Sequence, residues 1–125
     1  MKGIILTALL VFFNVNVAQA ACDTKSLKGN YEIAVKANTC AYIGVANFDG
    51  KGTMTMNTVR NCGGGVINSN WTLSYKINAN CTGSATGNNI AELGDLNFVF
   101  NSMLTNGGML FNTGSGLFFG TIIKQ

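Results

Sequence analysis

Three segments of the chain alternate between apolar and polar residues with a period of two. In residues 27–36 the odd positions are apolar or small, among them Tyr31 and Ile33, and the even positions are mostly polar. The same period recurs in residues 71–78 and 95–101. Successive side chains of a β-strand point to opposite faces of a sheet, so this pattern predicts strands with one buried face and one wet face. An antiparallel sheet is the arrangement that such strands favour.

Turn-rich spacers divide the rest of the chain into further predicted strands. The spacers at residues 49–52, 78–80 and 106–108 are rich in Asn, Asp and Gly, which tolerate the positive φ of tight turns. No segment of ten or more residues shows the apolar stripe of an amphipathic helix. The additional predicted strands cover residues 42–48, 53–59, 82–86, 109–112 and 117–123.

The pattern predicts an all-β fold, a single small antiparallel up-and-down β-barrel of about eight strands. The turns recur at short intervals, as in a meander of hairpins. The chain has no proline and only 10% charged residues, so it has few of the residues that protect exposed edge strands. Closure into a barrel removes the edges altogether. A two-sheet β-sandwich is the alternative.

The first 20 residues have the organisation of a secretory signal peptide. Lys2 gives a basic start, residues 3–13 carry no charge, and Ala18 and Ala20 supply the small residues of a cleavage site. The alternative of a membrane anchor is disfavoured because the apolar run is shorter than the roughly 20 residues that span a bilayer. A lipoprotein acylated on Cys22 is disfavoured because Gln19 stands where a Leu-like residue is needed. We therefore expect residues 21–125 to form a single secreted or periplasmic β-barrel domain without a membrane span.

Four cysteines in an exported chain predict two disulfides. Cys40 precedes the second predicted strand and Cys62 follows the third, so they face each other across the hairpin that turns at residues 49–52. Cys22 and Cys81 then fall together at the opposite end of an up-and-down barrel. The topology thus predicts the pairs 40–62 and 22–81. No Cys-x-x-Cys is present, and we expect no redox or metal site.

Composition and charge exclude several classes of function. The chain has no histidine, which removes Ser-His-Asp and Cys-His nucleophile systems and Cys/His zinc sites. Its eight basic and five acidic residues are spread singly along the sequence. Because nothing concentrates positive charge, we expect no nucleic-acid partner, and we expect no cofactor.

Several stretches of the chain resemble small exported bacterial proteins of unknown function. The resemblance implies a small barrel of the calycin type, similar in shape to the lipocalins and to the allene oxide cyclase barrel, and it implies no established activity. Cys81, in Asn-Cys-Thr-Gly, belongs to this pattern, whereas the other three cysteines are additional to it. The stretches that carry the resemblance are residues 27–31, 44–52, 73–83 and 119–125.

The predicted inward face is bulky, and three hypotheses about function follow from it. The first is a small apolar ligand bound at the barrel mouth, with Trp71, Phe98, Phe100 and Tyr75 as the candidate ligand-binding residues. The second is a filled barrel that acts as a structural or interaction protein of the cell envelope, with an unknown partner. The predicted inward residues are Tyr31, Phe48, Met54, Met56, Trp71, Tyr75, Phe98 and Phe100.

The third and least favoured hypothesis is an enzyme similar to the barrel cyclases. It would require a buried polar cluster, for instance Glu32 or Asn97 turned inward. With no histidine and no assigned catalytic residue, we expect that the protein is not an enzyme.

Overall fold

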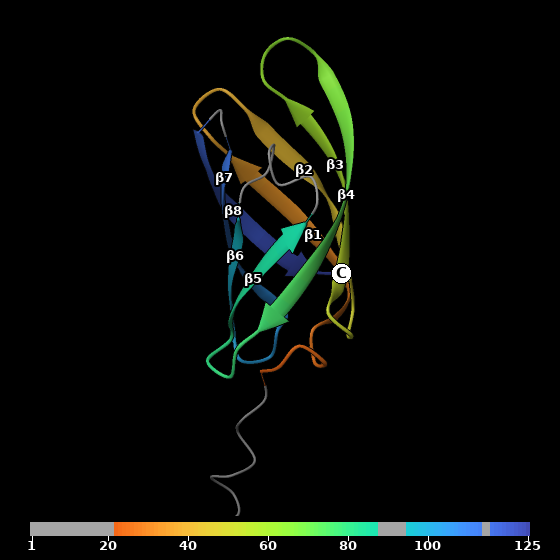
Figure 1. Ribbon diagram of the computed structural model, residues 1–125. Helices are drawn as coiled ribbons and strands as arrows, with labels where there is room; N and C mark the ends of the chain where they lie inside the picture. The colour runs from red at the N-terminus through yellow and green to blue at the C-terminus, as the bar shows by residue number, and fades with distance from the viewer. Residues whose placement is uncertain (1–21, 88–94, 114–115) are drawn as a thin grey trace, which may run out of the picture.

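The computed structural model describes residues 22–87, 95–113 and 116–125, and these residues form eight antiparallel strands joined in chain order (Figure 1). The first strand also pairs with the last, so the sheet closes on itself. The prediction of an eight-stranded up-and-down barrel is confirmed, and the β-sandwich alternative is wrong. Within these ranges no helix is long and apolar enough to cross a membrane. The strands are β1 (Lys28–Lys36), β2 (Ala41–Asp49), β3 (Thr53–Asn61), β4 (Val66–Ile77), β5 (Thr82–Gly87), β6 (Leu96–Phe100), β7 (Asn106–Thr113) and β8 (Gly116–Lys124).

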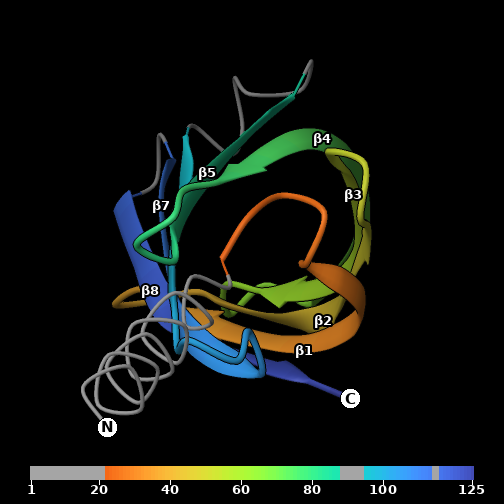
Figure 2. The same ribbon diagram turned by 90° about the horizontal axis from the view of Figure 1, so that it is seen from below.

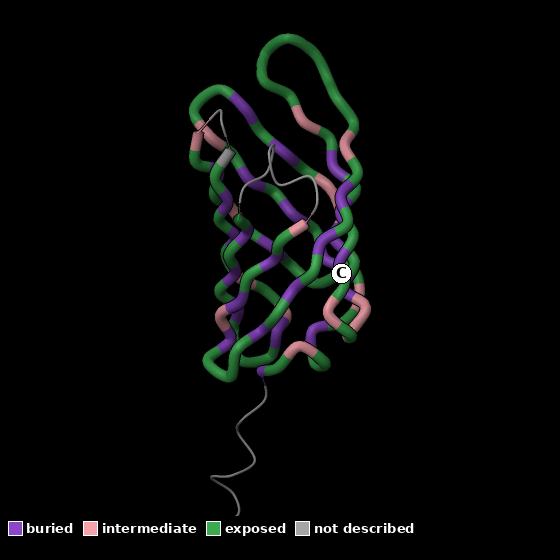
Figure 3. Tube along the Cα trace, viewed as in Figure 1, coloured by how far each residue is buried: buried purple, intermediate pink, exposed green. Residues whose placement is uncertain are grey.

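The alternation in the sequence becomes the inside and outside of the barrel. Along each strand buried and exposed residues follow one another, which is visible as alternating colours in Figure 3. All eight residues predicted to point inward are buried. The departure is the tip of the β3–β4 hairpin, which projects beyond the barrel and is exposed on both faces (Figures 1 and 3). Among the described residues, no other strand reaches that height to bury either face.

The two ends of the barrel are built from different segments. One end of the barrel, called the lower end, carries residues 22–27 and the β2–β3, β4–β5 and β6–β7 turns. The upper end carries the β1–β2 turn and the β3–β4 hairpin. Both predicted disulfides are formed, Cys22–Cys81 at the lower end and Cys40–Cys62 at the upper end.

Glycines inside strands allow neighbouring backbones to approach at the bends of the wall. A Cβ on Gly44 of β2 would overlap the carbonyl oxygen of Asn57 on β3. A Cβ on Gly120 of β8 would overlap the carbonyl oxygen of Ala34 on β1. Any side chain at these two positions would force the strands apart, so the glycines permit the curvature that closes the barrel.

One predicted turn is wrong. The Asn-Gly-Gly of residues 106–108 does not reverse the chain but begins strand β7, and the turn lies at residues 101–105. There the side chain of Asn101 accepts a hydrogen bond from the backbone N–H of Thr105 at 2.9 Å, and Leu104 adopts a φ of 55°. Gly107 is a glycine because a Cβ would overlap the carbonyl oxygen of Val99 on β6. The glycine thus serves strand packing and not turn formation.

Candidate functional site

The four predicted ligand-binding residues are all buried in the barrel, on two separate levels. Tyr75 and Phe98 both pack against Phe48, with ring centres 5.0 Å and 6.0 Å apart, and Phe100 continues this cluster 5.8 Å from Phe98. Trp71 makes no ring contact within the described part of the chain and lies in register with Met56 of β3. The structure therefore brings Tyr75, Phe98 and Phe100 together as packed core and leaves Trp71 apart from them.

The lower end is closed by the segment that precedes β1. Seen from this end, the orange segment before β1 crosses the opening of the barrel (Figure 2). Leu27 in this segment has no exposed surface. The Tyr75 hydroxyl donates to the carbonyl of Leu27 at 2.7 Å, with the carbonyl of Thr24 at 3.1 Å, and accepts from the backbone N–H of Gly50 at 2.9 Å. One buried hydroxyl thus joins the closing segment to the β2–β3 turn.

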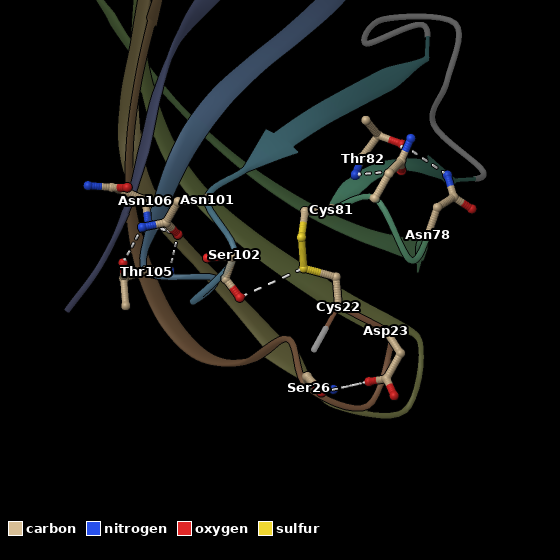
Figure 4. The surroundings of a disulfide bond; sticks show 11 residues. Cys22, Asp23, Ser26, Asn78, Cys81, Thr82, Asn101, Ser102, Thr105 and Asn106 are labelled. Carbon is tan, nitrogen blue, oxygen red and sulfur yellow. Dashed lines mark hydrogen bonds between the residues drawn. A yellow bond between two sulfur atoms is a disulfide. The ribbon is translucent and has the colours of Figure 1, made fainter. Parts of the chain in front are cut away.

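The lower disulfide anchors the start of the same segment to the β4–β5 turn (Figure 4). The Cys22 sulfur lies 3.9 Å from the carbonyl oxygen of Ser102. A disulfide sulfur has no proton to donate, so we treat this approach as a packing contact between the segment and the β6–β7 turn. The backbone N–H and hydroxyl of Ser26 donate to the Asp23 carboxylate at 2.8 Å and 2.7 Å.

The polar groups of the lower end have pKa values that match these contacts. Burial, together with the neighbouring Tyr75, raises the pKa of Tyr31, whose hydroxyl donates to the carbonyl of Leu104. Burial also raises the pKa of Tyr75, against the opposing effect of the backbone N–H groups of the β2–β3 turn. In that turn, the N–H groups of Thr53 and Lys51 lower the pKa of Asp49. The tyrosines remain protonated donors and the turn carboxylate remains an acceptor.

The inward face of the upper end carries Arg60, one of the basic residues that are spread singly along the sequence. Met54, Met56 and Thr58 of β3 are buried, and Arg60 is the next residue on that face and is partly buried. Its Cζ lies 6.0 Å from the centre of the Tyr42 ring. Its Nε is inaccessible and has no hydrogen-bond partner within the described ranges. The alternation of β3, continued one step beyond the predicted strand end at residue 59, would have identified it.

Trp71 supplies a second unpartnered donor inside the barrel. Its side chain is 6% exposed, and its Nε1 is inaccessible and makes no hydrogen bond to any residue that the structure describes. The buried hydroxyl of Thr58 on the neighbouring strand β3 does have a partner. It donates a hydrogen bond to the backbone carbonyl of Ser69 on β4 at 3.2 Å. Buried donors without partners are uncommon in folded proteins, so each one requires an explanation.

Aromatic packing forms the apolar surroundings of Arg60. The ring of Tyr42 packs edge-on against Phe111 and Phe118, with ring centres 5.6 Å and 5.0 Å away. Phe111 and Phe118 stack with centres 5.1 Å apart. These three rings are buried, so Arg60 lies at the edge of packed core.

The outer wall of the barrel has an apolar strip across β8, β1, β2 and β3. Hollows of about 280 Å³ and 440 Å³ lie along it, and Ala34 and Ile43 line both. Ala34 is in register with Ile43, and Ile43 with Val59, so the strip is continuous across three strands. Its most exposed members are Ile43 (59%), Leu117 (53%) and Phe119 (57%).

The structure also places the remaining polar candidates. Glu32 and Asn97 are exposed, so neither contributes to a buried polar cluster. In the part of the chain that the structure describes, no group of three or more His, Cys, Asp or Glu side chains could hold a metal ion. Comparison with models of protein families, with curated proteins and with solved structures finds no match to this chain.

Proposed function

We propose that the protein is an exported, disulfide-stabilised barrel that binds a small, mainly apolar molecule through its upper end. The observation that carries this proposal is the buried indole N–H of Trp71, which has no partner among residues 22–87, 95–113 and 116–125. An unsatisfied buried donor costs on the order of 1–3 kcal/mol, which a ligand acceptor would recover. Residues 22–27 close the lower end, which also favours entry of the ligand through the upper end.

The proposal includes export of the protein from the cytoplasm and a relation to calycin-like proteins. Two disulfides support an oxidising compartment, either periplasmic or extracellular, and residues 1–20 would then be the signal peptide. The closed barrel supports the relation to calycin-like exported bacterial proteins that the sequence motifs suggest. We propose binding without catalysis, since the exposed positions of Glu32 and Asn97 leave neither residue in the interior.

The experiment is a titration that uses the only tryptophan of the chain as the reporter. The emission of Trp71 is followed while the protein is titrated with ten-carbon to sixteen-carbon alkyl ligands, and binding is confirmed by native mass spectrometry. We expect a saturable shift with one ligand per barrel. The absence of both signals across the panel would overturn the proposal. Phe119→Ser, on the outer wall, is the matched control and should leave the titration unchanged.

A second candidate function is an interaction protein that docks through its outer wall. The apolar strip around Ile43 and Phe119 favours it, because contiguous exposed apolar surface marks interaction sites. The double variant Ile43→Ser/Phe119→Ser should then abolish cross-linking to an envelope partner while the tryptophan titration is unaffected. If the variant cross-links like the wild type, the outer wall is not the docking surface.

A further inference from the structure

We infer that the apolar strip of the outer wall binds a second copy of this chain, in a two-fold symmetric dimer in which Glu32 of each copy faces Lys36 of the other. This inference rests on the outer-wall docking that is the second candidate function, and it names the partner. It does not depend on ligand binding at the upper end. Three observations carry it: the order of the residues on the strip, their charges and the two hollows.

The outward residues of β2, β1 and β8 form three rows across the barrel wall, where these strands lie side by side (Figure 2). The register of β1 with its two neighbours sets the rows. All of these outward residues are exposed except Val45, which is partly buried. From the upper to the lower end, the rows are Ala41, Lys36 and Phe119; Ile43, Ala34 and Thr121; and Val45, Glu32 and Ile123.

A two-fold axis that crosses the strands along the middle row makes this surface complementary to itself. Such an axis turns a second copy face to face with the first and reverses its strands, so the upper row of one copy lies on the lower row of the other. Phe119 then packs on Ile123, and Ala41 packs on Val45. Ile43 meets Ile43 of the other copy. Each of these apolar residues therefore meets an apolar residue.

Charge selects this arrangement over the other two-fold orientation. Glu32 and Lys36 are the two charged residues of the three rows, and the axis along the middle row pairs each with its opposite. An axis parallel to the strands would instead place Lys36 on Lys36 and Glu32 on Glu32, which is unfavourable. Within one copy, the Glu32 carboxylate accepts a hydrogen bond of 3.4 Å from Gln125, a weak contact that an ion pair would outweigh.

The two hollows of the strip exchange under the same axis. The hollow of about 280 Å³ is lined by Lys36 and Phe119, and the hollow of about 440 Å³ is lined by Glu32 and Ile123. Phe119 is 57% exposed, and the axis directs its ring toward the larger hollow of the other copy. Dimerisation would thus remove from water two aromatic rings that a monomer leaves exposed.

The test is sedimentation equilibrium of the exported protein with both disulfides formed. We expect a monomer–dimer equilibrium with a dissociation constant on the order of 10 μM, since the strip is small by the standard of stable dimers. Phe119→Ser should raise this constant at least about tenfold, because each dimer loses two buried rings. Val99→Ser is the matched control. Val99 is 61% exposed on β6, outside the three rows, and its variant should dimerise like the wild type.

Charge reversal then tests the pairing of Glu32 with Lys36. Glu32→Lys and Lys36→Glu should each raise the dissociation constant at least about tenfold, because each replaces two attractive contacts by two repulsive ones. An equimolar mixture of the two variants should associate like the wild type, since each copy then presents the charges that the other lacks. Thermal unfolding of each variant confirms that it is folded.

Three results would overturn the inference: a monomer at every concentration, a dimer that Phe119→Ser and both charge reversals leave unchanged, or a mixture that fails to restore association. Ligand binding is decided separately by the Trp71 titration, and docking to an envelope partner by the cross-linking of Ile43→Ser/Phe119→Ser. A monomeric wild type whose outer-wall variant still loses an envelope partner would therefore refute self-association and leave the docking function standing.

Discussion

The two ends of this barrel differ in how their buried polar groups are satisfied. At the lower end, the hydroxyls of Tyr31 and Tyr75 hydrogen-bond to backbone groups of the segments that close the opening. Further up the barrel, the Nε of Arg60 and the Nε1 of Trp71 are inaccessible and have no partner among the described residues. Because an unsatisfied donor destabilises the folded state, the lower end contributes more to stability, and the upper end is where we propose that binding takes place.

The largest effect should come from removing the disulfides one end at a time. In the chain-entropy model, Cys22→Ser/Cys81→Ser, which opens a 59-residue loop, should lower the free energy of unfolding by about 4 kcal/mol. Cys40→Ser/Cys62→Ser opens a 22-residue loop and should cost about 3 kcal/mol. Denaturant unfolding under oxidising conditions measures both. A larger loss from the upper pair would contradict the assignment of stability to the lower end.

The second effect tests the hydroxyl that closes the lower end. Tyr75→Phe removes the donor to Leu27 and the acceptor for Gly50, so we expect a loss of about 2 kcal/mol in the free energy of unfolding. Tyr42→Phe is the matched control, since the Tyr42 hydroxyl forms no hydrogen bond to the described residues, and it should cost far less. Equal losses in the two variants would show that the lower network contributes no special stability.

The third effect should be a small change in stability, because two contributions of opposite sign offset each other. Arg60→Met removes a partly buried charge and its contact with the Tyr42 ring, two effects of opposite sign. In the absence of ligand the free energy of unfolding should therefore change by less than about 1 kcal/mol, as measured by denaturant unfolding. A loss comparable to that of Tyr75→Phe would mean that Arg60 is structural.

The smallest effect is a dependence of stability on alkaline pH. Folding raises the pKa of Tyr31 and Tyr75, so the protonated hydroxyls favour the folded state. This stabilisation is complete below the unfolded tyrosine pKa of about 10 and is lost as pH rises through the higher folded values. Thermal unfolding from pH 8 to pH 11 should show a falling midpoint, and Tyr75→Phe should make the decline shallower. A midpoint independent of pH would contradict the burial of these hydroxyls.

Most of the fold could be predicted from the sequence because strand alternation is local information. Residues 71–77 alternate so regularly that their inward and outward faces are evident without a partner strand. The disulfide pairs followed from the same logic, because an up-and-down order fixes which cysteines share an end of the barrel. Gly107 was misassigned to a turn because a glycine required by a neighbouring carbonyl looks the same in sequence as one required by positive φ.

The candidate site was predicted less well because it depends on contacts between distant strands. Trp71 was correctly placed inside, but its separation from Phe98 and Phe100 depends on how the strands stagger around the barrel. Arg60 was missed because the predicted strand ended at residue 59, one position before the residue that turns inward.

The sequence by itself thus determined the strands, their inward faces and the ends at which the cysteines lie, since each depends on residues a few positions apart. Only the tertiary structure decided which rings meet and which polar groups find partners. Phe48 meets Phe98 only after closure brings β2 and β6 to the same interior. The reason is physical: hydrogen-bond partners and ring contacts are distances between strands, and one strand's pattern contains no information about the stagger of another.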